Sequence, residues 1–192
     1  MIRIKEIEHE HEALIEIAKN YMKTIQDRCH SIDHMNDVVA YTKELLNDLE
    51  VKVNPEVCII GAYWHDVGRT KLDVGHEELS AKMLRRYMIE MNYDDKFIED
   101  CCEAIQYHKW NMTPTTVEGL IIKDADKLAY LGSGRWNACL EQKQRLDDII
   151  GLLPKLRNEI LYFDSSRKIY DREIVCIMRL LYDRYYEENG KK

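Results

Sequence analysis

The sequence predicts an all-α fold, and three observations support that class. The 192 residues include only 8 glycines and 3 prolines, a share well below the average of about 12%, so long elements run without interruption. Apolar residues recur at the spacing of an amphipathic helix along most of the chain. No stretch alternates apolar and polar residues over enough positions to predict a strand.

Local signals place the ends of the helices. Residues 14–25 keep the i, i+3, i+4, i+7 rhythm of a first helix. A second helix should start at Ser31 or Asp33, since both are good N-caps. Asn54-Pro55 should open a third, because proline suits the first helical position, and Gly68 should end it. Further helices are expected over residues 79–88, 97–107, 117–130, 136–163 and 170–187, with a break at Gly132-Ser-Gly134.

Composition narrows the function classes. The net charge of −7 repels phosphate backbones, so we expect no nucleic-acid partner. The longest stretch without Asp, Glu, Lys or Arg is Val57 to His65, far short of the ~20 residues that span a bilayer. The N-terminus carries acids where a signal peptide needs an apolar run. Six cysteines without a CxxC pair indicate reduced thiols, and we expect a cytoplasmic protein with no membrane contact.

Histidines and aspartates gather at expected helix ends. His65-Asp66 follows the apolar run Ile59-Ile-Gly-Ala-Tyr-Trp, and Asp126 follows Leu120-Ile-Ile. Burying either carboxylate costs several kcal/mol unless it is paired or bound to a cation. A shared divalent metal would satisfy both, and a His/Asp donor set suits manganese, iron, zinc or nickel better than calcium.

The pattern His34 … His65-Asp66 … Asp126 resembles the HD superfamily of metal-dependent phosphohydrolases. The surrounding residues match as well: Asp-His-Met-Asn-Asp-Val around His34, Trp-His-Asp-Val-Gly-Arg around Asp66 and Lys-Asp-Ala-Asp-Lys-Leu around Asp126. The resemblance covers about residues 30–135. It implies an all-helical domain in which these four residues bind one metal ion. It also makes magnesium a candidate ion, beside manganese, iron, zinc and nickel. We expect one domain over residues 1–192, with this core and a C-terminal helical extension over 136–192.

The resemblance matches the pattern of two-metal relatives only in part. His76 and His108 resemble the extra histidines of two-metal relatives, in which the aspartate of the HD pair bridges the ions. In the fullest two-metal pattern the later histidine is doubled, whereas Lys109 follows His108 here. Relatives often carry arginine three residues after the first ligand, and Asp37 stands at that position, so no phosphate role is carried over to it.

The resemblance implies hydrolysis of a small phosphorylated metabolite, with a nucleotide as the expected substrate, by a metal-activated water. A bound metal lowers the pKa of its water from 15.7 towards about 7, and Asp66 is the candidate catalytic residue that orients it. Arg69, Lys109 and Lys127 are candidates to bind phosphate, and each could instead be a solvated surface charge. The bond type, among monoester, diester and pyrophosphate, stays open.

Two other functions remain as alternatives. Some HD-fold proteins use a di-iron site for oxygenation and carry extra histidines like His76 and His108. A non-catalytic, ligand-sensing protein could keep the fold without turnover, although it would have no reason to retain Asp66 and Asp126 together. Tyr182, Tyr185 and Tyr186 are expected to pack or to contact a second subunit in a homo-oligomer.

The remaining histidines and the tryptophans have simpler interpretations. His9, His11 and His30 lie among Glu and Lys residues and are expected to be solvent-exposed. Trp64, Trp110 and Trp136 are expected in the core or in a cleft wall.

Overall fold

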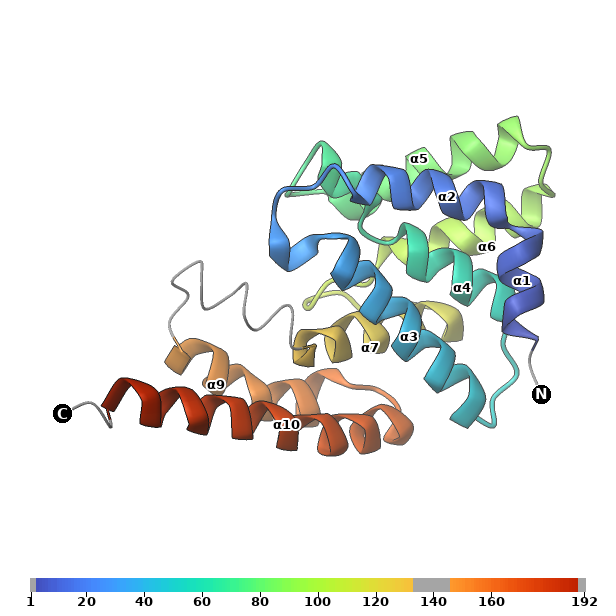
Figure 1. Ribbon diagram of the computed structural model, residues 1–192. Coiled ribbons are helices and arrows are strands. Elements are labelled where there is room, and N and C mark those ends of the chain that lie inside the picture. The colour runs from blue at the N-terminus through green and yellow to red at the C-terminus, as the bar shows by residue number, and fades with distance from the viewer. Residues whose placement is uncertain (1–2, 133–145, 190–192) are drawn as a thin grey trace.

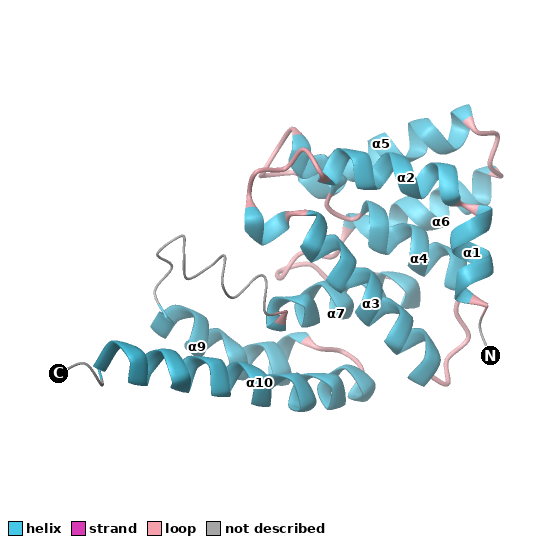
Figure 2. Cartoon of the chain, in the orientation of Figure 1, coloured by secondary structure: helices cyan, strands magenta, loops and turns pink. Residues whose placement is uncertain are grey.

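The computed structural model describes residues 3–132 and 146–189, and this part of the chain is helical and contains no strand (Figure 1, Figure 2). The all-α prediction is therefore confirmed. The first seven helices are α1 (Ile4–Glu10), α2 (Glu12–Met22), α3 (Ile32–Asp48), α4 (Pro55–Trp64), α5 (His76–Glu90), α6 (Asp95–Gln106) and α7 (Val117–Leu128).

The caps expected from the sequence start two of these helices. The Ser31 hydroxyl accepts a hydrogen bond from the Asp33 amide at 3.3 Å and begins α3. The Asn54 side chain accepts from the Glu56 amide at 3.0 Å and begins α4, with Pro55 as its first residue. Each cap satisfies an amide that the helix itself leaves without a partner.

Helix α4 is the centre of the core. Every residue from Val57 to Trp64 is buried, and the helix contacts α2, α3, α6 and α7. A helix that is apolar on all sides must be surrounded in this way. Because α4 ends at Trp64, the pair His65-Asp66 lies at its C-terminal end, at the bottom of the cleft described below.

A short 3₁₀ turn, η2 (Val67–Thr70), follows α4 and packs against α5. A Cβ on Gly68 would lie 2.1 Å from the His76 carbonyl oxygen and 2.8 Å from the Ser80 nitrogen. The Gly68 amide also donates to the Ser80 hydroxyl at 2.8 Å. Glycine therefore lets the chain after Asp66 lie directly on the first turn of α5 and sets the distance from Asp66 to His76.

The C-terminal segment packs beside α3 and α7 (Figure 1). After the turn η3 (Ala129–Leu131), the described chain resumes with α9 (Leu146–Lys155), a π turn (Leu156–Ile160) and α10 (Asp164–Asn189). Helix α10 starts earlier than the expected residue 170. Four parts of the sequence predictions lie outside the described residues. They are residues 136–145 of the expected 136–163 helix, Ser133 and Gly134 of the expected break, Trp136, and the Tyr185 side chain.

Polar contacts attach α10 to the core. The Asp124 carboxylate on α7 accepts the backbone amides of Tyr162 and Phe163, each at 3.0 Å. On the opposite side, Arg172 reaches Glu44 of α3, with Nη1 2.5 Å from Oε1. The start of α10 is thus fixed to the same helix that carries Asp126.

Other sequence predictions concern thiols and membranes. Cys29, Cys58, Cys101 and Cys102 are buried and Cys176 is exposed, and no disulfide joins any of these five described cysteines; Cys139 lies outside the described residues. Within the described ranges, no helix is both long enough and apolar enough to cross a membrane.

Candidate metal centre

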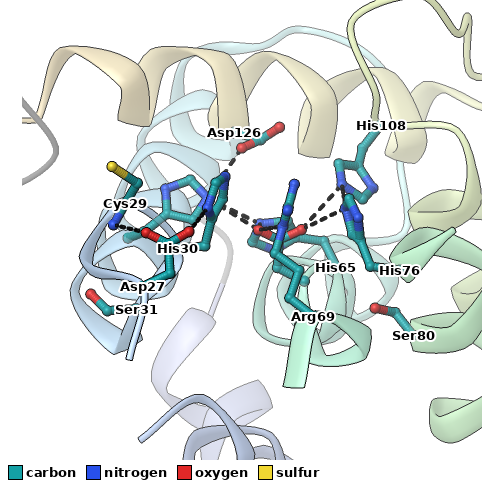
Figure 3. A network of polar contacts seen from close by, with 12 residues as sticks. Asp27, Cys29, His30, Ser31, His65, Arg69, His76, Ser80, His108 and Asp126 are labelled. Carbon is teal, nitrogen blue, oxygen red and sulfur yellow. Dashed lines mark hydrogen bonds and ion pairs between the residues drawn. The ribbon is translucent and has the colours of Figure 1, made fainter. Parts of the chain in front are cut away.

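Six histidine and aspartate side chains converge where the ends of five helices meet (Figure 3). They come from separate elements, and all six are buried. The residues are His34 on α3, His65 and Asp66 after α4, His76 at the start of α5, His108 just after α6, and Asp126 on α7. The structure therefore brings together every candidate ligand named from the sequence.

The ligand atoms form two adjacent groups that share Asp66. In one group His34, His65 and Asp66 place their ligand atoms within 4.8 Å of one another, and in the other Asp66, His76 and His108 do the same. Asp126 joins the first group, with Oδ1 3.2 Å from His34 Nε2. Oδ2 of Asp66 faces the first group and Oδ1 faces the second.

In the second group, backbone carbonyls fix which ring nitrogen faces Asp66. His76 Nδ1 donates to the Asp73 carbonyl at 2.7 Å, and His108 Nδ1 donates to the Ile105 carbonyl at 2.7 Å. Since a carbonyl cannot donate, each ring carries a hydrogen on Nδ1, and Nε2 is the nitrogen left to bind an ion. These Nε2 atoms lie 3.4 Å apart and 3.0 and 3.4 Å from Asp66 Oδ1, a buried oxygen with no hydrogen-bond partner among the described residues.

The first group is oriented in a similar way. His65 Nδ1 donates to the Ala62 carbonyl at 2.9 Å, which points Nε2 at His34 Nε2, 3.4 Å away. Burial lowers the pKa of His65 to about 3, so its ring is neutral at pH 7. A backbone carbonyl that fixes the ring through Nδ1 is the usual second contact of a metal-binding histidine.

Both carboxylates are held in the ionised form. Burial alone would raise the pKa of Asp66, but His65, His108, His76 and Arg69 outweigh it and hold that pKa well below its usual range. For Asp126, Lys127 and His34 likewise overcome the effect of burial and lower the pKa.

The donor set fits divalent cations. Asp66 Oδ1 and the Nε2 atoms of His76 and His108 lie within 3.4 Å of one another, so one cation could contact all three. Imidazole nitrogens with carboxylate oxygens suit first-row transition metals. Either group could hold one ion, with Asp66 touching both.

Three cations surround these groups. Arg69 Nε lies 2.9 Å from Asp66 Oδ2, and its Nη1 donates to Asp73 at 2.7 Å. Lys109 Nζ lies 2.5 Å from a carboxylate oxygen of Glu77. Lys127 forms an ion pair with Asp126 and is buried, and is therefore not a solvated surface charge.

A cleft of about 280 Å³ opens over the centre. Arg69, Lys109 and Lys127 all line it, so a phosphorylated ligand in the cleft would meet each of them. The described residues that line it are His30, Asp66, Arg69, Asp73, Val74, His76, His108, Lys109, Trp110, Asn111, Asp126 and Lys127.

His30 also lines this cleft, which the sequence did not indicate. The side chain is 21% exposed, its Nδ1 lies 2.5 Å from Asp27 Oδ2, and its ring faces His34 edge-on (Figure 3). Its spacing of four residues before His34 could have indicated a shared side of the chain, but the turn η1 (Arg28–His30) precedes α3 and hides that relation.

The expectation that His11 is solvent-exposed is wrong. His11 is buried, because its ring stacks on Tyr93 and Phe97 and its Nδ1 lies 2.9 Å from the Tyr93 hydroxyl. Glu77, which the sequence did not single out, is buried beside Lys109. His9 is exposed, as expected.

Asp37 lies outside the metal cleft. It lines a separate pocket with Tyr41 and Glu173, and a Cβ on Gly132 would lie 2.4 Å from its Oδ2. The residue that replaces the arginine of relatives therefore packs against the end of η3.

This arrangement defines the class: a helical protein with a buried His/Asp set that could hold a metal, under a cleft lined by both cations and acids. The chain belongs to the HD domain family, whose model matches residues 31–131, just over half of the sequence. That range contains all six candidate ligands.

Two solved structures share the fold. A crystal structure described as a predicted HD superfamily hydrolase from an uncultured Thermotogales bacterium is 22% identical with a TM-score of 0.74, covering 97% of this chain and 99% of that one. Bacillus subtilis YpgQ, solved in complex with ADP, is 14% identical with a TM-score of 0.67, covering 95% and 96%. No curated protein matches the sequence.

Proposed function

We propose that this protein is a metal-dependent phosphohydrolase whose substrate is a small phosphorylated metabolite, namely a nucleotide. One observation carries the proposal: Asp66 Oδ1 and the Nε2 atoms of His76 and His108 lie within 3.4 Å of one another at the floor of a cleft that three cations line together with three acids. The histidine nitrogens and the carboxylate oxygen favour a divalent cation, and the three positively charged side chains favour an anionic substrate.

Each part of the cleft has a role in this proposal. A divalent ion bound there supplies a water of lowered pKa and neutralises charge on phosphate oxygens. Asp66, with one oxygen towards each group, orients the attacking water. Arg69, Lys109 and Lys127 contact phosphate oxygens, and their charge offsets the negative charge that develops during transfer. The four acids that pair with these cations, Asp66, Asp73, Glu77 and Asp126, keep them positioned before substrate arrives.

The comparisons support the proposal. The family is that of HD domains, and a protein of the same fold was solved with ADP, a small phosphorylated ligand. We further propose that the ion is manganese, iron, magnesium, zinc or nickel, and that two ions bind.

Metal content and hydrolysis test the proposal together. Protein prepared without chelator should contain two divalent metal ions per chain by elemental analysis, and should hydrolyse nucleotides in a panel of phosphate esters. Asp66→Ala should lose the metal and reduce the rate by roughly a hundredfold or more. Glu78→Ala is the matched control, because Glu78 is an exposed acid near the start of α5 that does not line the cleft and belongs to neither ligand group.

Other outcomes would redirect the assignment. Absence of metal after reconstitution with manganese and iron would contradict the proposal. Two irons with oxygen uptake, and no phosphate release, would favour the oxygenase alternative. A nucleotide that stabilises the protein without being hydrolysed would favour a ligand sensor.

A further inference from the structure

The lining of the metal cleft is charged or polar except at two positions. Ten of its twelve described residues are histidines, acids, cations or an asparagine. Val74 and Trp110 alone among them offer a sizeable apolar surface. An apolar portion of a ligand in this cleft must therefore contact these two residues.

Val74 and Trp110 reach the cleft from separate loops. Val74 lies between η2 and α5 with 85% of its surface exposed, which leaves the side chain in water until a ligand covers it. Trp110 lies in the connection between α6 and α7, next to the exposed Asn111. Lys109 directly precedes Trp110, and Asp73, the partner of Arg69, directly precedes Val74, so both apolar side chains lie next to cations proposed to hold the phosphates.

Trp110 is held in place by its neighbours. Lys127 Nζ lies 5.1 Å from the centroid of the Trp110 ring, and Tyr130 meets the ring edge-on with centroids 6.0 Å apart. The loop itself is fixed because Lys123 donates to the Met112 carbonyl. An aromatic ring fixed before binding loses little conformational entropy when a ligand packs on it.

We infer that Val74 and Trp110 bind the base of a nucleotide, that Asn111 hydrogen-bonds to the edge of that base, and that these residues select a nucleotide over a phosphorylated sugar. The inference rests on the proposed function and specifies its substrate. A base presents flat apolar faces with polar atoms at its edge, which match an indole, a valine and an amide. A sugar presents hydroxyl groups on all sides and would leave Val74 and Trp110 against polar atoms.

Binding of ADP and of pyrophosphate to manganese-loaded protein separates the base from the phosphates. Calorimetry should show that the wild-type protein binds ADP more tightly than pyrophosphate. Trp110→Ala should weaken ADP binding about tenfold and leave pyrophosphate binding unchanged, while Trp110→Phe should restore most of the ADP affinity. Val74→Ser should cause a smaller loss for ADP alone. Leu72→Ala is the matched control, because Leu72 is 50% exposed on the same loop as Val74 but does not line the cleft.

Several results would overturn the inference. These are an unchanged ADP affinity in Trp110→Ala, an equal loss for ADP and pyrophosphate, or ribose 5-phosphate binding as tightly as ADP. Hydrolysis is measured separately on the same proteins. If ADP binds through Trp110 but no phosphate ester is cleaved, the base site stands and the proposed reaction falls. If nucleotides are cleaved with a KM that Trp110→Ala leaves unchanged, the reaction stands and the base site falls.

Discussion

At the residue scale, Asp66 differs from the other ligands because it faces both groups. His108 places its Nε2 3.4 Å from Asp66 Oδ1 in the second group, whereas Asp66 also places Oδ2 3.7 Å from the Nε2 atoms of His34 and His65 in the first. Replacing Asp66 and replacing His108 should therefore reduce the number of bound ions by different amounts.

His108→Ala should bind one ion fewer than the wild-type protein and keep the other, because His34, His65, Asp66 and Asp126 remain. Asp66→Ala should lose both. Elemental analysis of the two variants, reconstituted side by side with manganese, measures the difference. Loss of all metal in His108→Ala would show that the two groups do not act as separate sites.

That the six candidate ligands lie together could be predicted from the sequence, because they fall near expected helix ends and because the HD pattern sets their order. The neighbours of those ligands could not. His30 and His11 lie among charged residues in the sequence, and only the packing of distant elements reveals that one faces the cleft and the other is buried. The contacts of Lys127 with Asp126 and Trp110 were likewise not predicted, because the contact with Trp110 forms only where α7 lies beside the loop after α6.

At the element scale, the contact between η2 and α5 fixes the second group. A Cβ on Gly68 would meet backbone atoms of His76 and Ser80, which cannot yield by changing a rotamer. Gly68→Ala should therefore displace the start of α5, cost about 2 kcal/mol, and lower Tm by about 4–8 °C. Thermal unfolding followed by circular dichroism measures this.

Gly151→Ala is the control for that substitution. Gly151 is exposed in α9, and nothing lies within 4 Å of a Cβ built there. Alanine at this position should stabilise the helix by up to about 1 kcal/mol. A Gly68→Ala protein that melts with the wild type would show that α5 accommodates the methyl group.

Glu8 connects three helices and makes stability depend on pH. Its Oε1 accepts from Tyr63 at 2.7 Å and lies 2.6 Å from Lys43 Nζ. Burial opposes ionisation, but Lys43 and Tyr63 outweigh it and lower the pKa of Glu8 from its ordinary 4.5. The ionised group therefore stabilises the fold above pH 4.5, and that contribution is lost as the pH falls through the folded-state pKa.

Glu8→Gln should therefore lower Tm by about 2–4 °C at pH 7, corresponding to about 1 kcal/mol for a partly exposed pair. The difference from the wild type should shrink as the pH falls below 4.5 and through the folded-state pKa of Glu8, below which both carry a neutral side chain. Glu12→Gln, whose carboxylate is 71% exposed, should change Tm little over the same pH range. A difference for Glu8→Gln that stays constant as the pH falls would assign the effect to packing alone.

At the scale of the whole molecule, Asp124 connects the core to α10. We propose that residues 1–192 unfold as one domain, because the buried Asp124 carboxylate accepts two backbone amides at the start of α10. Asp124→Ala should leave both amides without a partner and destabilise the protein by about 2–3 kcal/mol, while Asp124→Asn, which keeps one acceptor, should lose less. Urea unfolding followed by circular dichroism and by tryptophan fluorescence should give coincident transitions; separate transitions in the wild type would contradict a single domain.

The metal ligands connect even more of the chain. They come from α3, α5 and α7 and from the ends of α4 and α6, so ion binding requires five helices to be in their folded positions. An ion that binds the folded chain and not the unfolded one stabilises it by about 2.7 kcal/mol at a free concentration of 100 Kd, which corresponds to about 5–10 °C in Tm for a chain of this size. Chelator should therefore lower Tm, and added manganese should raise it in a concentration-dependent way. In Asp66→Ala the same titration should leave Tm unchanged, because both groups lose their shared carboxylate. A wild-type Tm that ignores both chelator and manganese would mean that the two groups are polar packing and would remove the basis of the phosphohydrolase proposal.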